Sequence, residues 1–212
     1  MLTITEIFAG IQGETSFSGL PFVFVRLTGC NLRCVYCDTT YAYDSGRKFS
    51  FDEILSCVIS FELNRVCITG GEPMLHEDTP TLVRELIDLG NHVLIETNGT
   101  LPLSGIDPRA VKIMDVKCPD SGEQGKMFWE NFRYLNDQDE VKFVISSKQD
   151  YEYAKTVLEK YQKKARWSAL FSPVFGSLPY EHLAEWILED ALNVRFQLQI
   201  HKLVWGPERK GV

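Results

Sequence analysis

The sequence predicts an α/β fold, either an incomplete (β/α) barrel with mostly parallel strands or an open wound sheet. Short runs rich in β-branched residues alternate with longer amphipathic stretches, as where 65–69 precedes 78–90, and this rhythm is typical of βαβ units. Helical crossovers connect parallel strands, so most strands are expected to be parallel. With 212 residues, the chain is shorter than the roughly 250 residues of a full eight-fold barrel.

The individual elements follow from the same patterns. Apolar or alternating runs predict roughly seven strands, at 21–27, 65–69, 92–97, 111–116, 140–145, 167–172 and 194–200. Amphipathic stretches predict helices at 78–90, 127–136, 150–164 and 180–190, and a further one around Cys57. Because no repeat, low-complexity segment or linker divides the chain, residues 1–212 are expected to form a single domain.

Composition excludes several classes of protein. A net charge of -7 argues against nucleic-acid binding, which depends on clustered Lys and Arg. The amino terminus shows no signal-peptide pattern, and no apolar run approaches the roughly 20 residues that span a bilayer. We therefore expect a cytoplasmic protein with no membrane partner. In that reducing compartment, the six cysteines are ligands or core residues rather than disulfides.

Three cysteines stand close together directly after the strand at 21–27, in the pattern Cys30-x3-Cys34-x2-Cys37. A structural zinc site needs four ligands, and the chain has no second CxxC or His pair to complete one. An iron-sulfur cubane tolerates three thiolates and leaves one iron open to bind a ligand. The other cysteines, at 57, 67 and 118, are interpreted as small buried side chains.

Two further motifs end strands. Gly70-Gly71-Glu72-Pro73 follows 65–69, and Thr97 to Thr100 (TNGT) ends 92–97. Glycine lets backbone approach a ligand closely, and a carboxylate accepts hydrogen bonds from an amine. Each motif alone is also compatible with a simple turn.

Together the CxxxCxxC, GGEP and TNGT segments resemble the radical S-adenosylmethionine superfamily. The resemblance implies an incomplete barrel of the radical S-adenosylmethionine type, a [4Fe-4S] cluster on Cys30, Cys34 and Cys37, and S-adenosylmethionine bound at the open iron. It implies that the cofactor contacts are made by Tyr36, Cys37, Asp38, Gly70, Gly71, Glu72 and Gly99, with Ser172 and Pro173 as weaker candidates on the adenine side.

Residues 6–30, the CDT segment at 37–39 and QIHK at 199–202 resemble the 7-carboxy-7-deazaguanine synthase family. Thr15 replaces a glycine of the family pattern, and the chain continues past 202 as LVWGPERKGV. The resemblance implies a carbon-nitrogen lyase that converts 6-carboxy-5,6,7,8-tetrahydropterin to 7-carboxy-7-deazaguanine with loss of ammonia, on the way to queuosine. It also implies Mg²⁺ on Thr39, a flavodoxin-type electron donor and a homodimer. The implied substrate contacts are Ile11, Gln12, Gly13, Glu14, Arg26, Thr97 and His201.

Two alternatives remain open. A glycyl-radical activase shares the cysteine and GGEP-like motifs but acts on a protein partner, and IQGET with QIHK favours the synthase. A zinc-stapled binding module is the non-enzyme alternative, although it leaves GGEP, TNGT and the βα rhythm unexplained.

Strand parity adds two expectations about the cavity. In 194–200 the polar side chains alternate with apolar ones, which places His201 either in a wet cavity or on a solvent-exposed edge strand. Arg26 shares parity with Phe22 and Phe24 on a strand that is apolar on both faces, so its guanidinium is expected to point inward. A buried cation needs an anion, either Glu14 or Glu96 of the protein or the carboxylate of a substrate.

Overall fold

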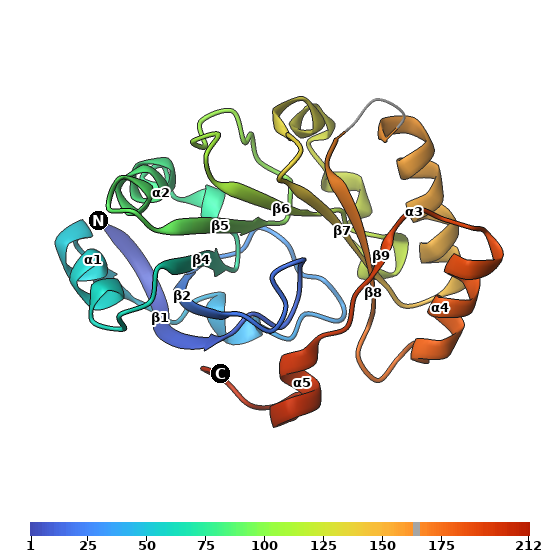
Figure 1. Ribbon diagram of the computed structural model, residues 1–212, viewed down its shortest axis with the longest axis horizontal. Coiled ribbons are helices and arrows are strands. Elements are labelled where there is room, and N and C mark those ends of the chain that lie inside the picture. Colours follow the sequence, from blue (N-terminus) through green and yellow to red (C-terminus); the bar gives the residue numbers. More distant parts are fainter. Residues whose placement is uncertain (163–165) are drawn as a thin grey trace.

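The computed structural model describes residues 1–162 and 166–212 and is built on a nine-stranded sheet (Figure 1). Its strand order is β3-β1-β2-β4-β5-β6-β7-β8-β9. All neighbours from β2 to β9 are parallel, whereas β1 is antiparallel to both β2 and β3. The strands are β1 Leu2–Ile11, β2 Pro21–Leu27, β3 Arg47–Phe49, β4 Arg65–Gly70, β5 His92–Thr97, β6 Val111–Asp115, β7 Glu140–Ile145, β8 Ser168–Pro173 and β9 Arg195–Phe196.

All the α-helices except the last cover one face of the sheet (Figure 1). The α-helices are α1 Phe51–Ile59, α2 Thr79–Asp88, α3 Lys148–Tyr161, α4 Tyr180–Glu189 and α5 Ile200–Trp205. Short 3₁₀ helices occupy Thr40–Ala42, Pro73–Leu75, Pro119–Ser121, Gln124–Lys126 and Trp129–Tyr134. No helix in the described ranges is long and apolar enough to cross a membrane.

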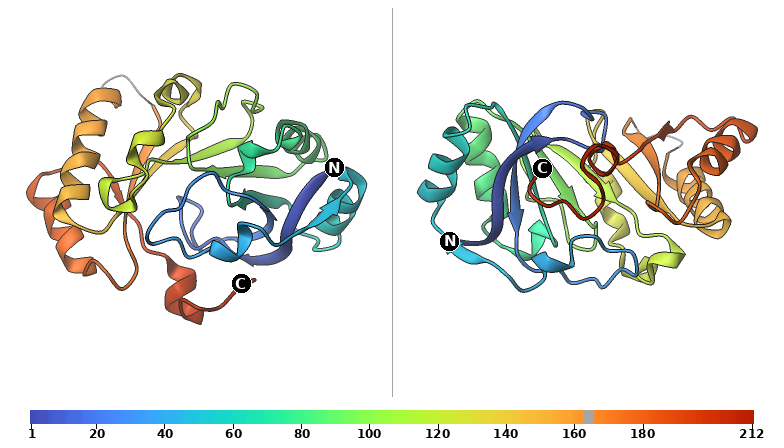
Figure 2. Two further views of the ribbon diagram at one scale, coloured as in Figure 1. Left: turned by 180° about the vertical axis from the view of Figure 1, so that it is seen from behind. Right: turned by 90° about the horizontal axis from the view of Figure 1, so that it is seen from below.

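Two apolar clusters join the sheet to these helices. One packs β1, β2, β4 and β5 against α1 and α2, and the other packs β6, β7 and β8 against α3 and α4. The opposite, concave face carries fewer apolar residues, and α5 and the C-terminal segment pass across it (Figure 2). Because side chains alternate between faces, every second residue of the central strands points away from the helices into this concave space.

Each of the seven expected strands is at least partly present, and the mostly parallel, unclosed sheet agrees with the expected incomplete barrel. The antiparallel strands β1 and β3 at the amino-terminal edge were not among the expected elements. The alternation in LTITEIFAGI was the signal that would have identified β1. Of the helix expected at 150–164, residues 163 and 164 lie outside the described residues.

Two expected elements were wrong. The stretch 127–136 forms only a 3₁₀ helix at Trp129–Tyr134, because Asn131 is buried there and its side-chain amide donates to the carbonyls of Gly99 and Leu101 (3.0 and 2.9 Å). These bonds tie the segment to the TNGT loop. The strand expected at 194–200 pairs only at Arg195–Phe196. It then turns into α5, where the backbone N–H of Ile200 donates to the Gly13 carbonyl (2.9 Å).

Candidate active site

A cavity of about 730 Å³ lies in the concave face of the sheet. Its size is within the range of small-molecule sites. Its floor is lined by side chains on the cavity-facing side of β2, β4, β5, β6 and β7, and its rim is lined by the loops that follow the strands. The carboxyl ends of parallel strands meet here, which is where α/β folds place their chemistry.

The cysteine loop forms part of this rim. Cys30, Cys34 and Cys37 all line the cavity and are partly exposed, whereas Cys57, Cys67 and Cys118 do not line it. The loop is fixed by close backbone packing: a Cβ on Gly71 would stand 2.1 Å from the carbonyl oxygen of Gly29 and 2.8 Å from the Cβ of Cys30. Glycine is therefore required at 71 for the GGEP turn to support the cysteine loop.

The three cysteine thiols suit an iron-sulfur cluster, because three thiolates can hold a cubane. In the parts of the chain that the structure describes, no three His, Cys, Asp or Glu side chains group as ligands of one metal ion. The three thiols instead border a shared cavity, as ligands at separate corners of a cubane would. Burial raises the pKa of Cys30, and raises that of Cys34 to about 11, so cluster binding would displace thiol protons.

Glu72 does not line the cavity, although an amine contact was expected of it. Its carboxylate is fully buried and accepts hydrogen bonds from the Met74 amide (2.9 Å), the Thr97 hydroxyl (2.8 Å) and the Asn98 amide (2.6 Å). These donors occupy three of the roughly four acceptor positions of a carboxylate. In this structure Glu72 thus joins the GGEP turn to the TNGT loop.

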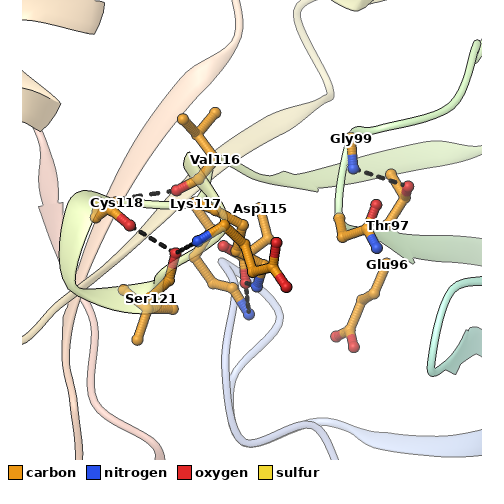
Figure 3. A network of polar contacts seen from close by, with 12 residues as sticks. Glu96, Thr97, Gly99, Asp115, Val116, Lys117, Cys118 and Ser121 are labelled. Atoms are coloured by element: carbon orange, nitrogen blue, oxygen red, sulfur yellow. Dashed lines mark hydrogen bonds and ion pairs between the residues drawn. The ribbon is translucent and has the colours of Figure 1, made fainter. Parts of the chain in front are cut away.

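The remaining expected cofactor contacts divide into two groups. Tyr36, Asp38, Gly70 and Gly71 line the cavity with the cysteines, whereas Gly99, Ser172 and Pro173 do not. Gly99 has a φ of 69°, and a Cβ on it would stand 2.7 Å from Cε of Met127. Its amide donates to the Thr97 hydroxyl (3.1 Å; Figure 3), which shapes the TNGT turn from within. After Pro173 the chain reaches the cavity at Val174 and Phe175.

All seven residues expected on the substrate side line the cavity, namely Ile11, Gln12, Gly13, Glu14, Arg26, Thr97 and His201. They come from the end of β1 and the loop after it, from β2, from β5 and from α5. His201 lies at the cavity, as expected, but it reaches the cavity from α5. The prediction from strand parity was therefore wrong, because His201 is not on a strand. Thr15, which replaces the family's glycine, adopts a left-handed conformation with a φ of 66°.

Arg26 points to the same side as Phe24 and lines the cavity. Its Nε donates to Oε1 of Glu6 (2.7 Å), which also accepts from the Tyr41 hydroxyl (2.8 Å). Glu6 was not among the anions considered from the sequence, because its strand β1 was not expected. No described residue accepts a hydrogen bond from the terminal guanidinium nitrogens of Arg26.

Thr39 and Asp38 form a small oxygen-rich part of the rim. The Thr39 hydroxyl donates to Oδ1 of Asp38 (2.8 Å), and Oδ2 of Asp38 pairs with Lys202 of α5. Burial opposes ionisation of Asp38, but the charge and hydrogen bond of Lys202, together with the hydrogen bond from Thr39, outweigh burial and lower the pKa. Hydroxyl and carboxylate oxygens are the ligands that Mg²⁺ prefers.

A charged network on the cavity floor was not anticipated from the sequence. Lys142 pairs with Glu14 (2.6 Å) and with Asp115 (3.5 Å), and Lys117 pairs with Asp115 (3.0 Å; Figure 3). Asp115 Oδ1 is buried and has no hydrogen-bond partner among the described residues. The sequence signal was the position of Asp115 and Lys117 at and just after a strand end, but pairing across strands is visible only in the fold.

The C-terminal segment closes one side of the cavity. Residues 207–212 line it, and a Cβ on Gly10 would stand 2.6 Å from the carboxyl carbon of Val212. The residues beyond 202 therefore fold back onto β1 rather than extending away from the site.

Comparisons with known proteins agree on this architecture. The model of the radical SAM superfamily matches residues 24–117. The chain is 45% identical to the 7-carboxy-7-deazaguanine synthase of Koribacter versatilis, with 100% of both chains covered, and 45% identical to that of Chlorobaculum tepidum, covering 100% of this chain and 97% of the relative. The crystal structure of QueE from Escherichia coli has a TM-score of 0.80 at 23% identity and covers 93% of each chain. At that identity the structural likeness concerns the fold.

Proposed function

This chain belongs to the 7-carboxy-7-deazaguanine synthase family of radical S-adenosylmethionine enzymes, and on that premise we propose that it converts 6-carboxy-5,6,7,8-tetrahydropterin to 7-carboxy-7-deazaguanine with loss of ammonia. One observation carries the proposal: the cysteine loop and the IQGET segment, which are separate in sequence, line the same cavity. A cofactor on the first would face a substrate on the second.

The family implies a [4Fe-4S] cluster and S-adenosylmethionine. Cys30, Cys34 and Cys37 would hold the cluster, and the cofactor would lie along 36–38 and against Gly70 and Gly71, which line the same cavity. Bound there, the pair would supply hydrogen-atom abstraction from the substrate. Glu72 would act as a positioning residue, because its carboxylate engages the protein's own backbone and Thr97.

The substrate's carboxylate would bind Arg26, which lines the cavity and uses only Nε for its hydrogen bond to Glu6. A planar guanidinium matches a carboxylate in two-point geometry. Gln12, Glu14, Thr97 and His201 would surround the pterin ring system. Mg²⁺ would sit at Thr39, beside Asp38, where two oxygen donors adjoin the cavity.

The proposal extends to the electron donor, the assembly of the chain and the fate of the product. A flavodoxin-type protein would donate the electron to the cluster. Two copies of the chain would associate as a homodimer, and the exposed apolar side chains Leu203, Val204 and Trp205 of α5 offer surface for such contact. The product would enter 7-deazapurine synthesis such as that of queuosine.

The test is a reconstitution experiment. Protein carrying an anaerobically rebuilt iron-sulfur cluster is incubated with carboxytetrahydropterin, S-adenosylmethionine, Mg²⁺ and a reductant, and products are identified by mass spectrometry. Because loss of ammonia accounts for every atom of the conversion, the expected result is 7-carboxy-7-deazaguanine and ammonia, formed only when S-adenosylmethionine is present. Cleavage of S-adenosylmethionine at the same rate with and without the pterin, and with no deazaguanine formed, would overturn the proposal.

A further inference from the structure

Glu14 is held from two sides by residues far away in sequence. Oε2 accepts from Nζ of Lys142 on β7 (2.6 Å), and Oε1 accepts from the side-chain amide of Gln199, just before α5 (2.6 Å). The backbone of Glu14 is also fixed, because its amide donates to the side chain of Gln12 (3.0 Å). Each carboxylate oxygen has two acceptor positions, so each retains one for a ligand in the cavity.

The environment keeps this carboxylate ionised. Burial opposes ionisation of Glu14, but the charge and hydrogen bond of Lys142, the hydrogen bond of Gln199 and the charge of His201 outweigh burial and lower the pKa to about 2. Asp38 is the other charged group near Glu14, and Lys142 also faces Asp115 and Glu96. An ionised carboxylate only accepts hydrogen bonds, so Glu14 selects a ligand edge that offers N–H or O–H donors.

Lys142 has no role in the catalytic scheme proposed above. Its side chain is 12% exposed, and it lies between the carboxylates of Glu14 and Asp115. A buried ammonium in this position compensates two carboxylates that would otherwise repel each other and lose their charge on burial. Removing it leaves Glu14 with Gln199 as its direct side-chain partner.

We propose that Lys142, assisted by Gln199, is a positioning and specificity residue. It holds Glu14 as a hydrogen-bond acceptor for a ring edge that carries adjacent N–H donors, such as the edge of a 2-amino-4-oxopyrimidine. The assignment rests on the proposed function, because that function brings a pterin ring to this cavity. Lys142 also lines the cavity, and we assign its effect on the ring to its pairing with Glu14. Its loss is therefore expected to weaken ring binding and to change the pH dependence of that binding, while the cluster remains intact.

The experiment measures binding without turnover. Fluorescent 6-carboxypterin, which has the ring edge but is already oxidised, is titrated into the reconstituted enzyme between pH 5 and 8. In Lys142→Gln we expect Kd to rise about tenfold to a hundredfold at pH 7, as for loss of a charge-assisted interaction. We also expect binding to weaken further as the pH falls. Without Lys142, burial raises the pKa of Glu14 and the carboxylate takes up a proton, whereas in wild type it stays ionised throughout this range.

Three variants and one analogue sharpen the result. Lys142→Arg retains a cation and is expected to recover part of the affinity, and Gln199→Ala is expected to raise Kd less than Lys142→Gln does. Lys155→Gln removes a lysine that pairs with Asp190 (2.6 Å) outside the cavity, so its Kd is expected to match wild type. A 2-desamino analogue of the ligand is expected to bind wild type more weakly but to lose little further affinity in Lys142→Gln.

The outcomes separate this inference from the proposed function. An unchanged Kd and pH profile in Lys142→Gln, with wild type forming deazaguanine, would overturn the role of Lys142 alone. If Lys142→Gln does not fold, Gln199→Ala decides, and wild-type affinity in that variant is the contrary result. A wild type that binds carboxypterin in the expected manner but forms no deazaguanine would contradict only the proposed function. If wild type neither binds carboxypterin in the expected manner nor forms deazaguanine, both the role of Lys142 and the proposed function are contradicted.

Discussion

Gly13 lies against the imidazole of His201, so closely that a Cβ on Gly13 would stand 1.8 Å from Nδ1. The Gly13 carbonyl also accepts from the amide of Ile200 (2.9 Å). The IQGET loop near the amino terminus and α5 near the carboxyl terminus thus form one wall of the cavity. A side chain at position 13 would therefore displace His201.

Gly13→Ala is expected to displace His201 and to raise KM for the pterin at least about tenfold, because small displacements of positioning groups are costly in a binding site. Iron content should stay at the wild-type level, since neither Gly13 nor His201 is among the proposed cluster ligands. Gly125→Ala is the matched control, because its Cβ would enter open space. A KM unchanged in Gly13→Ala would show that His201 does not contact the substrate.

Replacing Cys30, Cys34 or Cys37 by Ala is expected to abolish the visible absorption of the reconstituted cluster, because each thiol borders the shared cavity. Cys57→Ala should keep the full absorption, since Cys57 lies on α1 away from the cavity. Iron and sulfide analysis gives the count per chain. Full iron retention in Cys34→Ala would be decisive against the assignment.

Arg26→Lys is expected to lower kcat/KM for the pterin about tenfold to a hundredfold, which corresponds to the loss of a charge-assisted bond of about 1.5–3 kcal/mol. Lysine can keep a charge pair with Glu6 but cannot hold Glu6 and a substrate carboxylate in fixed geometry at once. Steady-state kinetics measure this effect, and binding of S-adenosylmethionine is the control. Unchanged kinetics would reduce Arg26 to the structural pair with Glu6.

Thr39→Ala is expected to raise the Mg²⁺ concentration that gives half-maximal turnover, because the variant lacks the hydroxyl oxygen beside Asp38. Thr39→Ser keeps that oxygen and should titrate close to wild type. Activity is measured over a Mg²⁺ series after chelation and dialysis. Identical titrations for wild type and Thr39→Ala would remove Thr39 from the metal site.

Glu72→Gln is expected to destabilise the fold by about 1–3 kcal/mol and to weaken binding of S-adenosylmethionine. In the variant an amide nitrogen replaces one carboxylate oxygen, either the one that accepts from Asn98 or the one that accepts from Thr97 and Met74. Urea unfolding measures the first effect. Glu77→Gln, at an exposed position, is the control. A wild-type unfolding midpoint would show that the buried carboxylate is not required to join the two loops.

The loops that carry the cofactor chemistry were predictable because their signals are local. Three cysteines within eight residues share a loop whatever the surrounding fold, and GGEP and TNGT end strands whose apolar character is plain in the sequence. Parallel strands bring such loops to one edge of a sheet. The position of Arg26 likewise followed from its parity on β2.

Other features depended on contacts that no local pattern records. Whether Glu72 faces a ligand or the protein is decided by the direction of one side chain in a turn, and here the amides of Met74 and Asn98 draw it inward. The expected strand at 194–200 ends early because β9 is an edge strand with a single neighbour, β8, and Ile200 then bonds to Gly13 instead.

The sequence by itself therefore determined the fold class and the family, and it predicts the cluster ligands, since each depends on spacing or on alternation along a short stretch. Tertiary structure alone decided which charges meet on the cavity floor. Glu14 and Lys142 are 128 positions apart, and Glu14 and Gln199 are 185 apart. Such pairs form only because the curved sheet directs β7 and the approach to α5 toward the same buried point, where an unpaired charge would be too costly to persist.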